Sequence, residues 1–494
     1  MQLSREECLR RFHERDPKHD GSFVVGVTST GIYCLPSCPA RRPKPENVRF
    51  FASEDPAREA GLRACRRCRP DQFYSDFDPD RERIEALAAR VRRRPADFAS
   101  AGALARAAGV GHTKLNELFH RELHDTPAAY LQRARVRAAA RALVRGSAVT
   151  AAGLDAGFES ASAYHEAFRR HMALAPGAYA KLGREFTLRL PPDYRPEDLF
   201  GLFGRDVQGR TERIETSPTR GGRATRRAAK ALVVNGQALR LELTFTPTRV
   251  RCTFHGGRAS RGLAARVHEA ALRMIGLDTD PGPFERRALR GRGSAAATGM
   301  RTLVRRRPGL RIPQTSDAFE GLVWVIVGQQ VNLSFASTCR ARLIELAGRP
   351  LADDFVAHPT ADEVAALDYD DLMPLQFSRR KAEYVIDTAR QVAAGELDLE
   401  GLRHATVGRT RATLSAVRGL GPWSIQYLLM RSFGYQDCVP VGDAALRNAL
   451  RRFYELEHAP DADETLACMA PFAPYRSFAT FHLWRSLADH GDDA

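Results

Sequence analysis

The sequence predicts a multidomain α+β protein, and three features support this prediction. The chain has 494 residues, of which 44% are hydrophobic, so it is long enough to bury separate cores in about three domains. Four cysteines in two close pairs mark a small domain near the amino terminus. A helical, Ala/Arg/Leu-rich segment and a later helical segment flank a shorter stretch in which apolar and polar residues alternate, as they do in antiparallel strands.

Basic side chains are in excess over acidic ones. The chain has 75 Lys and Arg against 59 Asp and Glu, a formal charge of +16, and the planar fork of arginine suits phosphate oxygens. Nucleic acid is therefore the first partner to test, and the alternative is a basic surface that only confers solubility. The amino-terminal residues lack the apolar segment of a signal peptide, and "GLVWVIVG" is too short to cross a bilayer. We expect a cytoplasmic, nucleoid-associated protein with no membrane partner.

The cysteine spacing predicts a zinc site. Cys34 and Cys38 form a C-x3-C pair, and Cys65 and Cys68 form a C-x2-C pair that 26 residues separate from the first. Two such pairs on turns can present four thiolates tetrahedrally, which is the geometry that zinc prefers. We therefore predict one Zn2+ at these four residues, and the alternative is a group of free buried thiols. The remaining cysteines are isolated and are expected to be small buried hydrophobes: Cys8, Cys252, Cys339, Cys438 and Cys468.

The segment from Asp20 to Asp71 resembles the amino-terminal domain of the Ada-type alkylation-response regulators. In that family the first of the zinc-bound cysteines accepts a methyl group from a DNA methylphosphotriester, which implies this role for Cys34. Zinc would then be both structural and nucleophile-activating, because it keeps a thiolate deprotonated and electron-rich. Methylation removes one negative charge, which should strengthen phosphate binding by neighbouring arginines. These arginines, for which a solvated basic face is the alternative, are Arg41, Arg42, Arg66, Arg67 and Arg69.

A repeat lies between Ile84 and about Lys181. Phe119, Pro127 and Tyr130 recur 49 residues later as Phe168, Pro176 and Tyr179. Each copy is typical of a Gly-led turn, a helix and a Pro-initiated helix, which is a helix-turn-helix arrangement. The pattern resembles the paired helix-turn-helix domain of AraC-type transcription activators. Candidates for the groove-facing surface, each of which could equally be a solvated helix position, are His112, Lys114, Asn116, Ser160, Ser162 and His165.

The middle of the chain predicts a small α+β domain of about 100 residues. "ALRLELTF" and "RVRCTFHG" alternate in polarity and predict antiparallel strands, and "GLAARVHEAALRMIGL" predicts a helix. The stretch 217–230, "SPTRGGRATRRAAK", is interpreted as a basic loop.

The stretch "GLGPW" predicts a hairpin between two helices. Gly419 and Gly421 would form the turn, and Pro422 would occupy the first turn of the second helix. Glycine allows close approach of a ligand, and the free amides at a helix N-terminus bind anions, so a DNA phosphate would fit there. An ordinary helix–helix turn is the alternative.

Asp443 follows this hairpin at the start of another predicted helix. The order of hairpin and aspartate resembles the helix-hairpin-helix DNA glycosylases, specifically the AlkA-type 3-methyladenine enzymes, from about Glu185 to Trp484. The resemblance implies that Asp443 is catalytic. The alternative to this role is that Asp443 only caps the start of the helix. The resemblance also implies an aromatic pocket that binds a cationic alkylated base by cation–π attraction, formed by Trp423, Tyr427 and Trp484. Trp324 lies in an apolar run and is expected in the core.

Departures from related patterns sharpen the prediction. Trp423 stands where glycosylases that also cleave the backbone have a Schiff-base lysine, so we expect a monofunctional enzyme. Only Cys468 follows Cys438, so we expect no iron–sulfur cluster. Gln330 stands where AlkA-type enzymes often have a leucine wedge, and it is the candidate for that role. No Pro-Cys-His-Arg motif is present, so repair of alkylated guanine oxygen is not predicted.

Four domains are predicted in all. They are a small zinc-bound α/β domain (1–78), an all-α double helix-turn-helix domain (82–183), a small antiparallel α+β domain (185–284) and an all-α helix-hairpin-helix glycosylase domain (285–494). The resemblances imply a bifunctional alkylation-damage response protein: a transcription activator that is also a suicidal methylphosphotriester methyltransferase, joined to a type II DNA-3-methyladenine glycosylase. Its expected partners are double-stranded DNA, damaged or promoter, and RNA polymerase. The alternative is a DNA-binding transcription regulator whose glycosylase domain is inactive.

Overall fold

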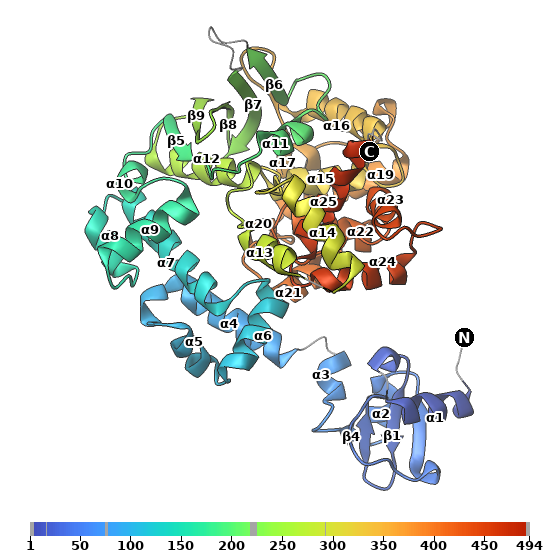
Figure 1. Cartoon of the computed structure of the whole chain (residues 1–494). Helices are drawn as coiled ribbons and strands as arrows, with labels where there is room; N and C mark the ends of the chain where they lie inside the picture. Colours follow the sequence, from blue (N-terminus) through green and yellow to red (C-terminus); the bar gives the residue numbers. More distant parts are fainter. Residues whose placement is uncertain (1–3, 16, 75–77, 218–224, 292, 491–494) are drawn as a thin grey trace. The chain divides into compact units, whose positions relative to one another are not determined.

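The protein folds into two compact units, Met1–Arg83 and Ile84–Ala494 (Figure 1). The computed structural model describes residues 4–15, 17–74, 78–217, 225–291 and 293–490. Within these ranges, helices are too short or too polar to cross a bilayer. The isolated cysteines Cys8, Cys252, Cys339 and Cys438 are buried as predicted, whereas Cys468 is only half-buried.

The first unit is built on a four-stranded sheet with the order β3-β1-β2-β4. Its strands are β1 (Val24–Val27), β2 (Ile32–Cys34), β3 (Val48–Phe51) and β4 (Arg63–Ala64). Its helices are α1 (Arg5–Glu14), α2 (Glu54–Glu59) and α3 (Pro70–Tyr74). β2 and β4 are parallel neighbours, so their carboxyl ends meet at the same edge of the sheet. Cys34 ends β2 and Cys65 follows β4, and this topology therefore brings the two cysteine pairs together.

The next part of the chain is helical, and its first helix, α4, runs from the end of the first unit into the second. The helices are α4 (Pro79–Arg93), α5 (Ala101–Ala108), α6 (His112–Leu123), α7 (Pro127–Val144), α8 (Val149–Asp155), α9 (Ala161–Met172) and α10 (Pro176–Tyr179). The predicted repeat is confirmed, because α6 and α9, and likewise α7 and α10, start 49 residues apart. The two copies also share a packing contact. Phe119 and Tyr130 meet edge to face at 5.6 Å, and Phe168 and Tyr179 meet in the same way at 5.4 Å.

A five-stranded antiparallel sheet follows, with the order β5-β9-β8-β7-β6. Its elements are β5 (Glu185–Arg189), α11 (Pro196–Phe203), β6 (Glu212–Ser217), β7 (Thr225–Val234), β8 (Gln237–Phe245), β9 (Arg249–Gly256) and α12 (Arg261–Met274). The predicted strands pair as β8 and β9, and the predicted helix is α12. Apolar residues of β8 alternate inward, as in a sheet with one buried face.

The prediction of a basic loop over 217–230 was wrong for part of its length. Residues 218–224 lie outside the described residues, but Thr225–Lys230 belongs to β7 and pairs with β8. The basic composition suggested an exposed loop, but Lys230 is only 3% exposed and its charge is neutralised inside the protein. Its Nζ lies 2.5 Å from Glu212 and 2.6 Å from Glu320, so two carboxylates compensate the buried charge.

The second helix-turn-helix copy shares a hydrophobic core with this sheet. Phe168 and Tyr179 belong to the same cluster of buried residues as Leu241 and Phe254 of the strands. The buried ring of His268, on α12, bonds through Nε2 to the carbonyl oxygen of Met172 at 2.9 Å. The first copy has a separate core that includes Phe119. Helix α9 is therefore packed into the sheet-bearing part of the chain.

Helices make up most of the rest of the second unit (Figure 1). They are α13 (Gly282–Arg290), α14 (Ala295–Arg306), α15 (Ala318–Val327), α16 (Leu333–Ala347), α17 (Ala361–Ala365), α18 (Tyr369–Leu372), α19 (Arg379–Ala393), α20 (Leu399–Leu402), α21 (Val407–Ser415), α22 (Pro422–Arg431), α23 (Ala444–Phe453), α24 (Ala462–Met469) and α25 (Arg476–Leu487). A short ribbon pairs β10 (Arg349–Pro350) with β11 (Val356–Ala357). The apolar helix α15 is central to the core, which holds together helices from α13 to α25.

Polar contacts join the first helix-turn-helix copy to these helices. Glu85 on α4 accepts hydrogen bonds from the Thr406 hydroxyl at 2.6 Å and from Arg409 at 2.7 Å. The buried His124, which ends α6, accepts through Nδ1 a hydrogen bond from the Asp437 amide at 3.1 Å. Burial lowers the pKa of His124 to about 4, so its ring is neutral and Nδ1 can act as an acceptor.

Candidate functional sites

Gly419 and Gly421 form the hairpin between α21 and α22, as predicted, but they act differently. Gly419 has φ of +94°, and a Cβ there would lie 2.4 Å from the Tyr384 ring. Gly421 caps α22 ahead of Pro422, and a Cβ there would meet nothing within 4 Å. Gln329 Nε2 holds the turn by donating to the Gly419 carbonyl oxygen at 2.7 Å. The hairpin is thus fixed at Gly419 and open at Gly421, where the first amides of α22 are free of side-chain caps.

Asp443 is both an N-cap and a contact of the aromatic residues. Its Oδ1 accepts hydrogen bonds from the Leu446 amide at 2.8 Å and from Trp484 Nε1 at 3.0 Å. Its Oδ2 accepts one from Trp423 Nε1 at 3.0 Å. The helix cap fixes the start of α23, and the two indoles fix the orientation of the half-buried carboxylate. The two interpretations of Asp443 therefore do not exclude each other.

The three predicted pocket aromatics lie together around this carboxylate. The ring centroid of Tyr427 is 5.4 Å from Trp423 and 6.1 Å from Trp484. α22 supplies Trp423 and Tyr427 one helical turn apart, and α25 supplies Trp484. The site therefore presents flat aromatic faces beside one carboxylate.

Arginines border this aromatic group, and sequence reasoning missed them. Arg205 donates to the Tyr427 hydroxyl at 3.3 Å, and its guanidinium lies 5.3 Å from the Trp324 ring. Trp324 is half-buried at the edge of the core rather than fully inside it. Burial alone would raise the pKa of Tyr427, but the positive charges of Arg205 and Arg431 lower it. Arg205 lies 222 residues before Tyr427, so no local pattern could have indicated this contact.

Gln330, the predicted wedge, lies exposed just after α15. Its φ of +56° is in the left-handed region, which is uncommon for a residue other than glycine. The neighbouring Gln329, by contrast, is bound to the hairpin through Gly419 and Ser424. Gln330 is thus held next to the hairpin by its neighbour while its own side chain stays exposed.

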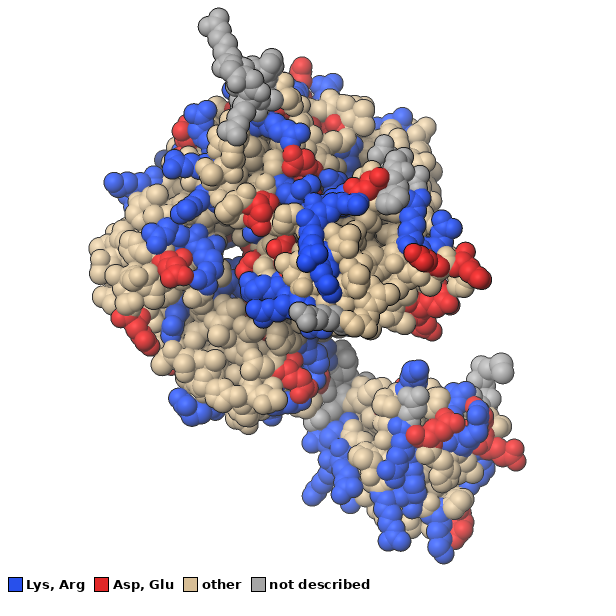
Figure 2. Space-filling model, in the orientation of Figure 1, with Lys and Arg blue, Asp and Glu red and all other residues tan. Residues whose placement is uncertain are grey.

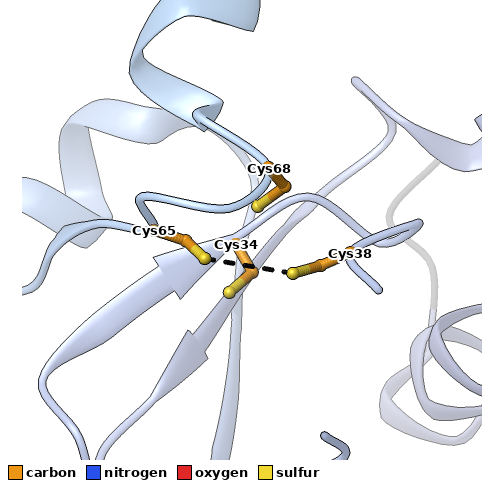
Figure 3. A group of neighbouring side chains, drawn as sticks. All are labelled: Cys34, Cys38, Cys65 and Cys68. Atoms are coloured by element: carbon orange, nitrogen blue, oxygen red, sulfur yellow. Dashed lines mark hydrogen bonds between the residues drawn. The ribbon is translucent and has the colours of Figure 1, made fainter. Parts of the chain in front are cut away.

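The four predicted zinc ligands converge in the first unit (Figure 3). Their Sγ atoms all lie within 4.8 Å of one another, and those of Cys38 and Cys65 are 3.9 Å apart. Zn–S bonds of about 2.3 Å in a tetrahedron require sulfur–sulfur distances of about 3.8 Å, so the group fits zinc. The amides of Leu35 and Arg67 point at Cys68 and Cys65 Sγ at 3.4 Å, which favours thiolates. Cys34 is 6% exposed, and Cys68 is the most exposed of the four.

The arginines near the cysteines fall into two groups. Arg41, Arg66 and Arg67 are exposed, and their side chains make no hydrogen bond or ion pair with any part of the chain that the structure describes. Arg42 is half-buried, with its guanidinium 3.8 Å from the centre of the Phe12 ring, and Arg69 pairs with Asp71 at 3.3 Å. Figure 2 shows many Lys and Arg side chains on the visible face of this unit. The first group is better placed to meet phosphates.

The predicted groove-facing residues lie on α6 and α9 or at their starts. His112 and Asn116 of α6 and Ser162 of α9 are exposed, whereas Lys114 is half-buried and pairs with Glu117 at 3.1 Å. Ser160 is the N-cap of α9, and its hydroxyl accepts from the Ala163 amide at 3.2 Å. His165 is half-buried against Tyr164. Both helices thus carry polar side chains near their starts, at positions that correspond in the two copies of the repeat.

Family models match three parts of the chain. They are the metal binding domain of Ada (residues 7–71), a helix-turn-helix domain (residues 104–182) and the HhH-GPD superfamily of base excision DNA repair proteins (residues 323–474). Together with the four-cysteine site and the hairpin, these matches define a class of protein: a zinc-bearing helix-turn-helix regulator joined to a helix-hairpin-helix DNA repair fold.

Relatives support this organisation along the whole chain. A "Probable bifunctional transcriptional activator/DNA repair enzyme AlkA" of Mycobacterium tuberculosis is 31% identical over 98% of this chain and 96% of its own length. The chain belongs to this family of bifunctional transcriptional activator/DNA repair enzymes. The Escherichia coli "Bifunctional transcriptional activator/DNA repair enzyme Ada" is 32% identical over 35% of this chain and 49% of its own. The 3-methyladenine DNA-glycosylase from Archaeoglobus fulgidus shares the fold, with a TM-score of 0.52 at 20% identity over 62% of this chain and 98% of its own.

Proposed function

We propose that the carboxyl-terminal part of the chain is a type II DNA-3-methyladenine glycosylase, which hydrolyses the bond between an alkylated base and its sugar. The observation that carries this proposal is the carboxylate of Asp443, which two indole N–H groups hold beside the aromatic group. The HhH-GPD match and the hairpin support the same reaction class.

The reaction needs little acid catalysis, because alkylation of a ring nitrogen makes the base a cationic leaving group. The nucleotide is rotated out of the duplex, the base is held, and cleavage leaves an oxocarbenium-like sugar. Asp443 would stabilise that positive charge and orient the attacking water. The indoles of Trp423 and Trp484 keep both carboxylate oxygens in place, so little reorganisation is needed in the transition state.

Base recognition would come from Trp423 and Trp484, whose electron-rich faces attract a cationic base. The positive charges of Arg205 and Arg431 near Tyr427 would repel a cationic base. We therefore propose that Tyr427 shapes the pocket and does not recognise the charge of the base. Gly421 and the first amides of α22 would bind a backbone phosphate, and Gln330 would fill the space left by the rotated nucleotide.

We propose that the first unit accepts methyl groups from DNA methylphosphotriesters. The four cysteines would hold one Zn2+, which when bound keeps the Cys34 sulfur deprotonated at neutral pH. The Cys34 thiolate attacks the methyl carbon, a sulfur–carbon bond forms, and the carbon–oxygen bond breaks with its electron pair left on the phosphate oxygen. Nothing returns the methyl group, so each molecule reacts once.

Methylation would switch the regulatory part on. It removes one negative charge near Arg41, Arg66 and Arg67, and charges act over about 8 Å at physiological salt, so phosphate binding strengthens close to the zinc site. α6 and α9 would then hold promoter DNA in two major grooves, and the complex would recruit RNA polymerase. The test is promoter affinity at fixed salt before and after methyl transfer. An unchanged affinity with a methylated Cys34 would leave the chemistry standing and remove the electrostatic switch.

A release assay separates an active glycosylase from a regulator with an inactive repair fold. The full chain is incubated with methylated duplex DNA, and free bases are identified by mass spectrometry. We expect free 3-methyladenine and no borohydride-trapped protein–DNA adduct, because Trp423 offers no amine for a Schiff base. Absence of any released base would establish the inactive alternative, and a trapped adduct would contradict a monofunctional mechanism.

A further inference from the structure

An arginine-lined cavity lies where the first helix-turn-helix copy meets the glycosylase helices. Its volume is about 180 Å³. One of its lining residues, Asp278, is acidic. Five are arginines: Arg92, Arg133, Arg137, Arg141 and Arg403. Figure 2 shows Lys and Arg side chains gathered in this region of the second unit. The cavity therefore concentrates positive charge and shares no residue with either site described above.

Three of these arginines lie on one face of α7. Arg133, Arg137 and Arg141 are spaced by four residues, which places them one above another along the helix. Like charges at this spacing repel each other and destabilise a helix. The opposite face of α7 is packed into the protein through residues such as Leu131 and Val136, so the helix cannot turn the arginines away.

Most of this charge has no carboxylate partner. Arg133 pairs with Asp125, and Arg403 pairs with Glu400 at 3.1 Å. Arg92 and Arg141 donate only to neutral oxygens, at 2.8 Å to the carbonyl of His404 and at 3.2 Å to the carbonyl of Arg92. Arg137 makes no hydrogen bond or ion pair with any residue in the described part of the chain. The guanidinium groups of Arg92, Arg137 and Arg141 thus form no ion pair within the described residues.

The positive charge of these arginines also affects the pKa of a neighbouring histidine. Burial, followed by the charges of Arg137 and Arg92, lowers the pKa of His404 to about 4. The carboxylate that lines the cavity, Asp278, is half-buried and accepts hydrogen bonds of 2.8 Å from the neutral amide of Gln314, and it forms no ion pair with the lining arginines.

We propose that this cavity is a binding site for a small phosphate-bearing molecule. Guanidinium forks match phosphate oxygens in shape and charge, and the volume suits a phosphate or diphosphate group but not a stretch of duplex. A bound anion would neutralise the α7 arginines and would connect α4 and α7 to residues 403–405 and 433–436, which line the other side. The ligand would therefore stabilise the junction between the regulatory and repair parts of the chain.

The test uses pyrophosphate as the probe and the full-length protein in phosphate-free buffer. Isothermal titration calorimetry should show saturable binding to the wild type. Arg137→Gln should weaken this binding about tenfold or more, because it removes a charged donor that has no other partner. The matched control is Arg106→Gln, which changes an exposed arginine of α5 outside the cavity and should bind as the wild type does.

Thermal unfolding without ligand gives a second readout. Arg137→Gln should unfold at the same temperature as the wild type or higher, since it relieves repulsion on α7. A lower unfolding temperature without pyrophosphate, no saturable binding by the wild type, or equal affinity in Arg137→Gln would each overturn the proposal. If Arg137→Gln instead weakens duplex DNA binding about tenfold while pyrophosphate does not bind, the occupant is a DNA phosphate and the small-ligand assignment is wrong.

Discussion

Trp484 Nε1 donates a hydrogen bond of 3.0 Å to Oδ1 of Asp443, although the two residues are 41 positions apart. Trp423 makes the equivalent bond to the other carboxylate oxygen. A buried indole N–H needs an acceptor, and an N-cap carboxylate has lone pairs to spare after it has bonded to the Leu446 amide. One side chain therefore starts helix α23, satisfies two tryptophans and presents a negative charge beside the aromatic group.

Asp443→Asn is expected to retain DNA binding and to lose base release by a factor of about 100 or more, because an amide supplies no negative charge to the developing cation. Asparagine is as good an N-cap as aspartate, so α23 should remain folded. The measurement is single-turnover release of 3-methyladenine from duplex DNA.

The control for this variant is Asp461→Asn. Asp461 is also an N-cap aspartate, which accepts from the Glu464 amide at 2.9 Å, but it lies at the start of α24 and contacts none of the pocket aromatics. It should release base at the wild-type rate. Undiminished release by Asp443→Asn would exclude Asp443 as the catalytic residue.

Trp484→Phe keeps an aromatic ring but removes the hydrogen bond to Asp443. A hydrogen bond to a charged group contributes about 1.5–3 kcal/mol, so we expect base release to slow by roughly 10- to 100-fold. The effect should vanish when Asp443 is already asparagine, which a double-mutant cycle measures. Equal losses in both backgrounds would mean that Trp484 acts through the base alone.

Cys34→Ser should accept no methyl group, while promoter binding stays at its unmethylated level. The matched control is Cys8→Ser, because Cys8 is buried in the same cluster but is not one of the four grouped cysteines. Mass spectrometry after reaction with methylphosphotriester DNA locates the added mass. A methyl group on Cys38, Cys65 or Cys68, of which Cys68 is the most exposed, would show that the nucleophile is wrongly assigned.

Stability should fall as the pH is lowered from about 6.5. Burial lowers the pKa of several histidines, to about 4 for His124 and His268 and to about 3 for His171 and His482. In the unfolded chain these rings take up protons near pH 6.5, so each one costs up to about 1.4 kcal/mol of stability per pH unit below that value. The loss continues down to the folded-state pKa. Asp198, whose pKa burial raises to about 6, opposes this trend in part.

His482→Phe tests this pH dependence. His482 is 0% exposed, and both of its ring nitrogens lack a hydrogen-bond partner in the part of the chain that the structure describes. Because phenylalanine does not titrate, the unfolding temperature of the variant should drop less between pH 7 and pH 5. His112→Gln, which alters an exposed histidine, should not change the slope. An unchanged slope in His482→Phe would show that this ring does not titrate on unfolding.

Features that local chemistry determines could be predicted from the sequence. Helices α6 and α9 start at the predicted spacing because turn, helix and proline signals repeat within short windows. Pro422 and Gly421 begin α22 as expected, and the four cysteines lie close together because their pairs flank two adjacent strands. Asp443 was predictable as an N-cap from its position alone.

Features that depend on tertiary packing could not be predicted. Arg205 reaches Tyr427 across 222 residues, and Lys230 is buried only because Glu212 and Glu320 meet it inside the protein. The common core of the second helix-turn-helix copy and the β5–β9 sheet also arises from contacts between distant segments. Composition indicated a loop at Lys230 because a lone sequence carries no sign of such partners.

Both proposed activities can be measured in one incubation of the full chain with duplex DNA that carries methylphosphotriesters and 3-methyladenine. Mass spectrometry then identifies the released bases and the peptide that contains Cys34. We expect free 3-methyladenine, released over many turnovers, together with a single added methyl group on Cys34. DNA that keeps its alkylated bases, or a methyl group that is absent from Cys34, would contradict the claim that one chain both senses and repairs alkylation.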